Sequence, residues 1–193
     1  MAGRRSHLER EPGYIYHHGI RTANLAGEII GKVQGKKTVF DPVLYTGALF
    51  HDVGKGFAAH NEAGAVAARS LLDGVCGPAD LDRISDIVKY HCIRKNGLDL
   101  DGEILAVQDA DMIDHFGAQE IWLSIYYQAY SHGSQHDLIE YWDTDNFRER
   151  TAKLRGLLNF DISRSIFDDR VDFQESFLSR FKLENDGKVP GEL

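Results

Sequence analysis

Histidine and aspartate side chains that could bind a metal recur at comparable places along the chain. His18 lies near the start of one apolar stretch, and the pair His51-Asp52 ends the next one. His60 and His91 also lie near the ends of apolar stretches. Ionisable groups beside apolar segments are costly to bury unless something binds them. Imidazole and carboxylate together suit divalent transition metals, so these residues predict a metal site.

A further carboxylate is available in the apolar segment "QDADMID", which contains Asp109 and Asp111. Helical spacing places these two acids on nearly opposite sides of a helix. The stripe shared with Leu105, Met112 and Phe116 slightly favours Asp109 as the buried acid. The spacing alone therefore leaves both acids open as ligands.

Helices must position these residues, because alternation typical of strands is hard to find. Asp41-Pro42 is a typical helix start, with a capping acid before a proline. The expected helices span 14–33, 42–50, 60–72, 81–91, 103–116, 118–130, 137–158 and 169–181. We interpret the aromatic stripe Trp122, Tyr126, Tyr127 and Tyr130 as core rather than as a wall for stacking a base. The expected fold is all-α: a single compact helical domain with a metal site between its helices.

We expect an N-terminal extension over 1–13, one helical domain over 14–182 and a frayed tail over 183–193. The formal net charge of -8 argues against a broad nucleic-acid surface. Cys76 and Cys92 are the only cysteines, so the sequence has no disulfide framework. No signal peptide and no run of roughly 20 apolar residues is found, so a soluble cytoplasmic protein is expected. A homodimer is left open.

The order and the flanks of these residues resemble the HD-domain superfamily of metal-dependent phosphohydrolases. The resemblance covers 14–130 and lies in "HGIRTANLA", "ALFHDVGK", "HNEAGAVAARSLL", "IVKYHCIRKNG" and "EILAVQDADMIDHFGA". It implies metal ligands at His18, His51, Asp52 and Asp111. It thereby favours His18 over His17, and it leaves Asp109 beside the ligands rather than among them.

The resemblance also implies an activity. We expect a metal-dependent phosphohydrolase that cleaves a phosphomonoester or phosphodiester, a nucleotide or related small molecule, by attack of a metal-bound water. Mn, Fe, Co, Ni, Zn and Mg all stay open as the ion. Asp52 and His91 are the expected catalytic residues. The expected contacts to the substrate phosphate are Lys55, His60, Arg94 and Lys95.

Two departures from the family pattern concern the substrate more than the metal. Cys92 follows His91 where many relatives have a second histidine, and Met112 replaces a basic residue. Two other functions therefore stay open. One is a di-iron oxidoreductase of the HD-like kind, in which His60 and His91 hold a second metal. The other is a non-catalytic binding module that a metal stabilises.

Overall fold

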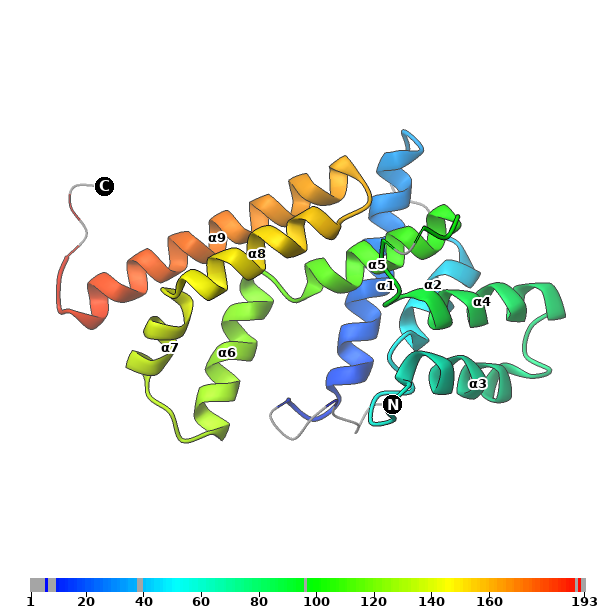
Figure 1. Ribbon diagram of the computed structural model, residues 1–193, viewed down its shortest axis with the longest axis horizontal. Coiled ribbons are helices and arrows are strands. Elements are labelled where there is room, and N and C mark those ends of the chain that lie inside the picture. Colours follow the sequence, from blue (N-terminus) through cyan, green and yellow to red (C-terminus); the bar gives the residue numbers. More distant parts are fainter. Residues whose placement is uncertain (1–5, 7–9, 38–39, 96, 190, 192–193) are drawn as a thin grey trace.

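The computed structural model describes residues 6, 10–37, 40–95, 97–189 and 191, and every regular element among them is a helix (Figure 1). This confirms the all-α prediction. The described helices are α1 (Tyr14–Val33), α2 (Pro42–Phe50), α3 (His60–Leu72), α4 (Pro78–Tyr90), α5 (Gly102–Asp114), α6 (Ala118–Tyr130), α7 (Gln135–Trp142), α8 (Asp145–Leu157) and α9 (Asp161–Asn185). Most of the expected extension over 1–13 lies outside the described residues.

Helices α1 to α5 form one end of the elongated molecule, and α6 and α7 lie toward the other end (Figure 1). Helix α1 packs against α2 and α5, while α4 packs against α2 and α3. The main apolar core lies between them and includes the buried side chains Ile29, Ala48, Val107 and Ile113. The core therefore fixes α1, α2 and α5, which carry the predicted metal ligands.

The start of α2 follows the prediction. The Asp41 carboxylate accepts hydrogen bonds from the backbone N–H groups of Val43 and Leu44, and Pro42 occupies the first turn. Such a cap satisfies donors that the helix leaves without partners. The last turn of α2 consequently places His51 at its C-terminal end.

Close backbone packing joins the turn after α2 to the start of α3. A Cβ atom added at Gly54 would lie 2.0 Å from the carbonyl oxygen of His60 and 2.6 Å from the backbone nitrogen of Gly64. Only glycine fits at this approach, since any side chain would push the two segments apart. The glycine of "HDVG" thus holds the turn after Asp52 against the helix that begins at His60.

The C-terminal helices differ from the expected ones. The single helix expected over 137–158 is two helices, because Thr144 accepts a hydrogen bond from the backbone N–H of Phe147 and caps α8. The helix expected over 169–181 begins at Asp161 and runs to Asn185, so the first residues of the expected tail are helical. Local capping chemistry decides the first of these boundaries.

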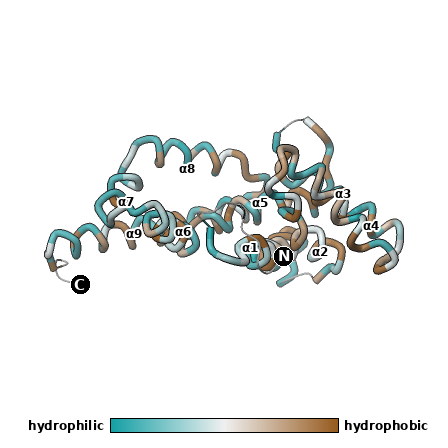
Figure 2. Tube along the Cα trace, turned by 90° about the horizontal axis from the view of Figure 1, so that it is seen from below, coloured by the Kyte–Doolittle hydropathy of each residue, from teal (hydrophilic) through white to brown (hydrophobic). Residues whose placement is uncertain are grey.

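None of the residues of helix α8 is buried, although Phe147, Leu154 and Leu157 pack against the core from outside. Viewed from below, its tube runs beside the other helices and is largely hydrophilic (Figure 2). The aromatic stripe on α6 is not core either: Trp122 is 47% exposed and Tyr127 is 48% exposed. The interpretation of this stripe as core is therefore wrong. No described helix is both long and apolar enough to span a membrane.

A buried carboxylate on α5 connects the N-terminal helices to α9. Asp109 is fully buried and accepts hydrogen bonds from the backbone N–H groups of Asn159, at 2.9 Å, and Phe160, at 3.1 Å. These two residues form the turn that leads into α9. Asp109 therefore holds the start of α9 against α5.

Replacing Asp109 with alanine should destabilise the fold. The change leaves the partly buried N–H groups of Asn159 and Phe160 without acceptors, so the free energy of unfolding should fall by about 2 kcal/mol. Urea denaturation followed by circular dichroism measures this. A variant as stable as the unchanged chain would show that these hydrogen bonds contribute nothing.

Candidate metal centre

Four side chains from separate parts of the sequence converge between α1, α2 and α5. His18 Nε2 lies 3.2 Å from His51 Nε2 and 3.2 Å from Asp111 Oδ1. His51 Nε2 lies 3.6 Å from Asp111 Oδ1 and 3.7 Å from Asp52 Oδ1. Two ligand atoms about 2.0–2.1 Å from one ion at tetrahedral angles are about 3.4 Å apart, so these spacings fit a shared cation.

The hydrogen bonds at the outer ring nitrogens direct the free lone pairs inward. His51 Nδ1 donates to the carbonyl oxygen of Ala48 at 2.6 Å, and His18 Nδ1 donates to Asp114 Oδ2 at 2.7 Å. In a neutral imidazole, an Nδ1 that carries the proton leaves Nε2 with a lone pair. Two such lone pairs and a carboxylate oxygen of Asp111 then face one another. They repel one another unless a proton or a cation lies between them. A set of lone pairs that face a common point is what a metal ion requires of its ligands.

The electrostatics of His18 favour a positive charge at this point. Burial lowers the pKa of His18, but hydrogen bonds to Asp111 and Asp114, with the charges of both carboxylates, raise it to about 9. Burial also disfavours the charged form of Asp111 and so raises its pKa. Hydrogen bonds from His18 and His51 nevertheless hold this pKa well below its usual value. Without a metal, a proton on His18 supplies the positive charge that a bound cation would supply instead.

The two acids of "DAD" have different surroundings. Asp111 contacts His18 and His51, whereas Asp109 points toward the turn before α9 and contacts neither. Asp109 is the more buried of the two acids, as the apolar stripe indicated. Its carboxylate, however, accepts hydrogen bonds from backbone N–H groups and does not contact the histidines. The geometry thus places Asp111, and not Asp109, among the candidate ligands.

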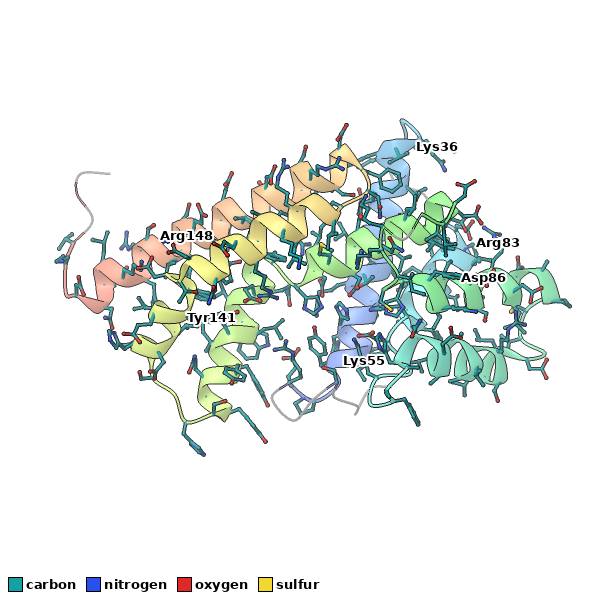
Figure 3. All side chains as sticks on the ribbon, in the orientation of Figure 1. Lys36, Lys55, Arg83, Asp86, Tyr141 and Arg148 are labelled. Atoms are coloured by element: carbon teal, nitrogen blue, oxygen red, sulfur yellow. The ribbon has the colours of Figure 1, made fainter. Side chains whose placement is uncertain are left out.

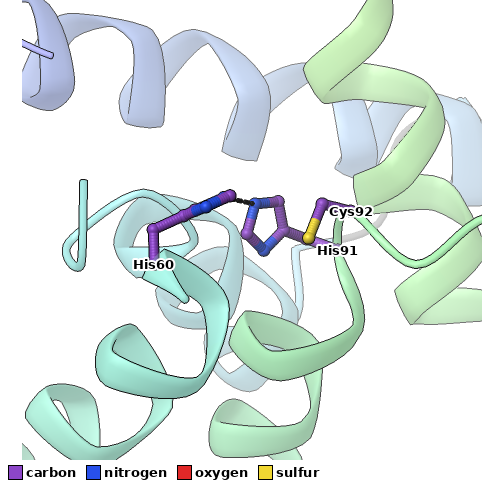
Figure 4. A group of neighbouring side chains, drawn as sticks. All are labelled: His60, His91 and Cys92. Atoms are coloured by element: carbon purple, nitrogen blue, oxygen red, sulfur yellow. Dashed lines mark hydrogen bonds between the residues drawn. The ribbon is translucent and has the colours of Figure 1, made fainter. Parts of the chain in front are cut away.

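A second group of donors adjoins the first through Asp52. His91 Nε2 lies 3.6 Å from Asp52 Oδ1 and 3.3 Å from His60 Nε2 (Figure 4). His91 Nδ1 donates to the carbonyl oxygen of Val88 at 2.7 Å, so its Nε2 also faces inward with a lone pair. His60, His91 and Cys92 offer ligand atoms within 4.8 Å of one another, as do His51, Asp52 and His91. Asp52 therefore lies between two clusters that could each hold an ion.

Three of the predicted phosphate contacts lie at this site, and one does not. Lys55 Nζ is 3.3 Å from Asp52 Oδ1, and His60 Nε2 is 4.0 Å from the same oxygen. Arg94 donates from Nη2 to Asp111 Oδ2 at 3.1 Å. Lys95 instead donates to Asn159 Oδ1 and is exposed outside the cluster.

The sequence reasoning missed a supporting layer around His18. Asp114 receives three hydrogen bonds from Arg21: from Nε to Oδ1 at 2.9 Å and to Oδ2 at 3.1 Å, and from Nη2 to Oδ2 at 2.9 Å. His115 Nε2 lies 3.8 Å from Asp111 Oδ1, and its Nδ1 is 3.3 Å from the hydroxyl of Tyr14. Spacing could have found Asp114 and His115, because they follow Asp111 by three and four residues on one helix face.

These supporting residues have distinct charges. Arg21 and His18 lower the pKa of Asp114 in spite of burial, so it stays an anion beside the Nδ1 of His18. Burial and the charge of His18 lower the pKa of His115 to about 4, so this ring is neutral near pH 7. An anionic partner on the outer nitrogen fixes the orientation of an imidazole ligand and raises its basicity.

Two variants on one helix should separate the ligand from the structural acid. We expect Asp111→Asn to lose the bound metal, because an amide is a weak neutral ligand, and Asp109→Asn to retain it. Elemental analysis of the purified chains counts the metal. Equal metal content in both variants would contradict the assignment of Asp111.

Asp114→Asn should weaken metal binding by about 10- to 100-fold, the usual effect of losing the carboxylate partner of a histidine ligand. The measurement is a competition titration against a chelator. Asp86→Asn, a change at an exposed residue of α4, is the matched control and should leave affinity unchanged. Unaltered affinity in Asp114→Asn would show that this carboxylate does not support His18.

Comparison with known proteins places this geometry in a family. The family model described as the HD domain matches residues 15–118, which include every candidate ligand. No curated protein matches the chain.

Several solved bacterial structures share the fold. One HD-superfamily hydrolase from Bacillus thuringiensis has a TM-score of 0.66 at 20% identity, over 93% of this chain and 90% of its own. Bacillus subtilis YpgQ in complex with ADP has a TM-score of 0.59 at 23% identity, over 91% and 89%. The Lin1889 protein of Listeria innocua has a TM-score of 0.61 at 19% identity, over 92% and 93%. Because the family model spans more than half of the sequence, this chain belongs to the HD-domain family.

Proposed function

We propose that this protein is a metal-dependent phosphohydrolase that cleaves a phosphomonoester or phosphodiester of a nucleotide or a related small molecule. The observation that carries the proposal is that His18, His51 and Asp111 bring their ligand atoms within 3.6 Å of one another, while Asp52 lies 3.7 Å from His51. A bound divalent ion would lower the pKa of a water there and offset negative charge on a phosphoryl group.

Basic side chains beside the ligands support a phosphate as the group that binds there. Arg94 Nη1 is buried and has no hydrogen-bond partner among the described residues, although Nη2 of the same guanidinium is bonded to Asp111. A buried donor without a partner is costly, and a phosphate oxygen would satisfy it with a charge-assisted hydrogen bond. Lys55 adds a second positive charge beside Asp52.

His91 has the position expected of a proton-transferring group. Its ring is buried, its Nδ1 is fixed by Val88, and its Nε2 faces Asp52 and His60. A neutral histidine in this position can take a proton at Nε2 from the attacking water and pass it to a leaving oxygen. Asp52, held as an anion because His51 and His91 lower its pKa despite burial, orients both the first cluster and this ring.

Two observations support a nucleotide as the substrate. YpgQ, a structural neighbour at 23% identity, has been solved in complex with ADP. We infer that this chain also binds a nucleotide, because its site combines candidate metal ligands with an arginine donor that lacks a hydrogen-bond partner among the described residues. The soluble cytoplasmic location expected from the sequence is part of this proposal.

A di-iron oxidoreductase is the second candidate function. It is favoured by one specific observation: His60 and His91 form a second donor group that meets the first at Asp52. In the hydrolase, the same two histidines contact the phosphate or transfer a proton. The number of bound ions and the use of oxygen distinguish these functions.

We expect phosphate release from some member of a panel of nucleotides and phosphodiesters, and Arg94→Gln should lower kcat/KM by about 10- to 100-fold with metal content retained. His51→Ala should remove both metal and turnover. Lys36→Gln, at the opposite end of α1 from Lys55 (Figure 3), is the matched control and should behave as the unchanged chain.

Other results would overturn the proposal. Full turnover in His51→Ala would end the metal-dependent account. Two irons per chain together with oxygen consumption and no phosphate release would favour the oxidoreductase. A metal-loaded chain that releases no phosphate and consumes no oxygen would be the non-catalytic binding module.

A further inference from the structure

A cavity of about 340 Å³ lies outside the metal centre, among residues of α6, α7 and α8 and Arg10 before α1. Tyr141, which lines it, belongs to α7, whereas Lys55 of the metal centre lies near the start of α1 (Figure 3). This volume is at the lower end of small-molecule sites, which run from roughly 300 to 1,000 Å³. The cavity therefore suits a small ligand.

Opposite charges line this cavity without pairing directly. Glu120 is 9% exposed, and its carboxylate accepts a hydrogen bond from the Ser124 hydroxyl at 3.3 Å. None of the ion pairs among the described residues includes Glu120. Arg150 and Arg10 also line the cavity, and their charges act on this carboxylate from a distance. Burying a carboxylate without an ion-pair partner is costly, so a bound cation would stabilise it.

The remaining walls are apolar or aromatic. Leu123 and Leu138 line the cavity, together with Tyr127 and Tyr141, which are 48% and 42% exposed. The Tyr141 hydroxyl accepts a hydrogen bond of 3.4 Å from Nη1 of Arg150. This explains why part of the α6 stripe is not in the core: Tyr127 faces a cavity. The surfaces can hold an apolar side chain and, on a ring face, an ammonium group.

We propose that this cavity binds a free α-amino acid with an apolar or aromatic side chain. Its ammonium group would contact Glu120, its carboxylate would contact Arg150 and Arg10, and its side chain would lie against Leu123, Leu138 and the tyrosine rings. A zwitterion satisfies both signs of charge at once. A simple anion would leave the Glu120 carboxylate without a cationic partner, and a simple cation would leave the guanidinium groups without an anionic one.

The test uses the full chain as purified, and the variants described below establish whether the ligand binds in this cavity. Isothermal titration calorimetry compares L-phenylalanine with phenethylamine, which lacks the carboxylate, and with 3-phenylpropionate, which lacks the ammonium. We expect L-phenylalanine to bind at least about tenfold more tightly than either analogue, because each loses one charged hydrogen-bonded contact. Equal affinity of the three compounds, or no binding of L-phenylalanine, overturns the proposal.

Two variants assign the charges to their partners. Glu120→Gln should weaken L-phenylalanine binding at least about tenfold without weakening 3-phenylpropionate, and Arg150→Gln should weaken both of these but not phenethylamine. Glu140→Gln, at an exposed residue of α7, removes the same charge and should leave binding unchanged. Circular dichroism verifies that each variant is folded.

Unchanged L-phenylalanine binding in Glu120→Gln and in Arg150→Gln would overturn the proposal even if binding occurs elsewhere on the protein. The test is independent of the proposed hydrolysis, because it needs no turnover. A chain that binds L-phenylalanine as described but releases no phosphate would contradict only the phosphohydrolase function.

Discussion

The mutual repulsion of inward-facing lone pairs is the constraint on which the site depends. His18, His51 and Asp111 bring donor atoms within 3.6 Å of one another, inside a region that excludes most water. Such an arrangement persists only with a positive charge at its centre. The fold holds it through partners on the far side of each ring, namely Ala48 for His51 and Asp114 for His18. The candidate ligands are therefore held in place before any ion binds.

Different structural devices hold the ligands, and they differ in how easily they can be changed. His51 and His91 are both held by a carbonyl oxygen three residues earlier in their own helix, so the backbone fixes their tautomers whatever the neighbouring side chains are. His18 depends on side chains from another helix, Asp114 and, through it, Arg21. We infer that His18 is the ligand most sensitive to substitutions outside the cluster.

Sequence reasoning went furthest where local patterns decide the structure. The cap at Asp41, the all-α fold and the end of α2 at His51 all follow from short-range signals. The choice between Asp109 and Asp111 did not, because both acids lie on a mostly buried helix and their partners come from distant segments. For the same reason, Lys95 could not be separated from Arg94: neighbours in sequence diverge where the backbone leaves the helix, and Lys95 has a positive φ of 50°.

A single turn of helix α5 contacts both the candidate metal centre and the segment that leads into α9. Asp111 faces His18, while Asp109, two residues earlier, faces the backbone that leads into α9. The C-terminal end of the chain therefore cannot be removed without disturbing α5. A chain ending after α8 would lack the backbone N–H groups that bind Asp109 and would leave its carboxylate unpaired on the helix that carries Asp111. The segment that leads into α9 therefore helps to hold the centre, although it supplies none of the candidate ligands.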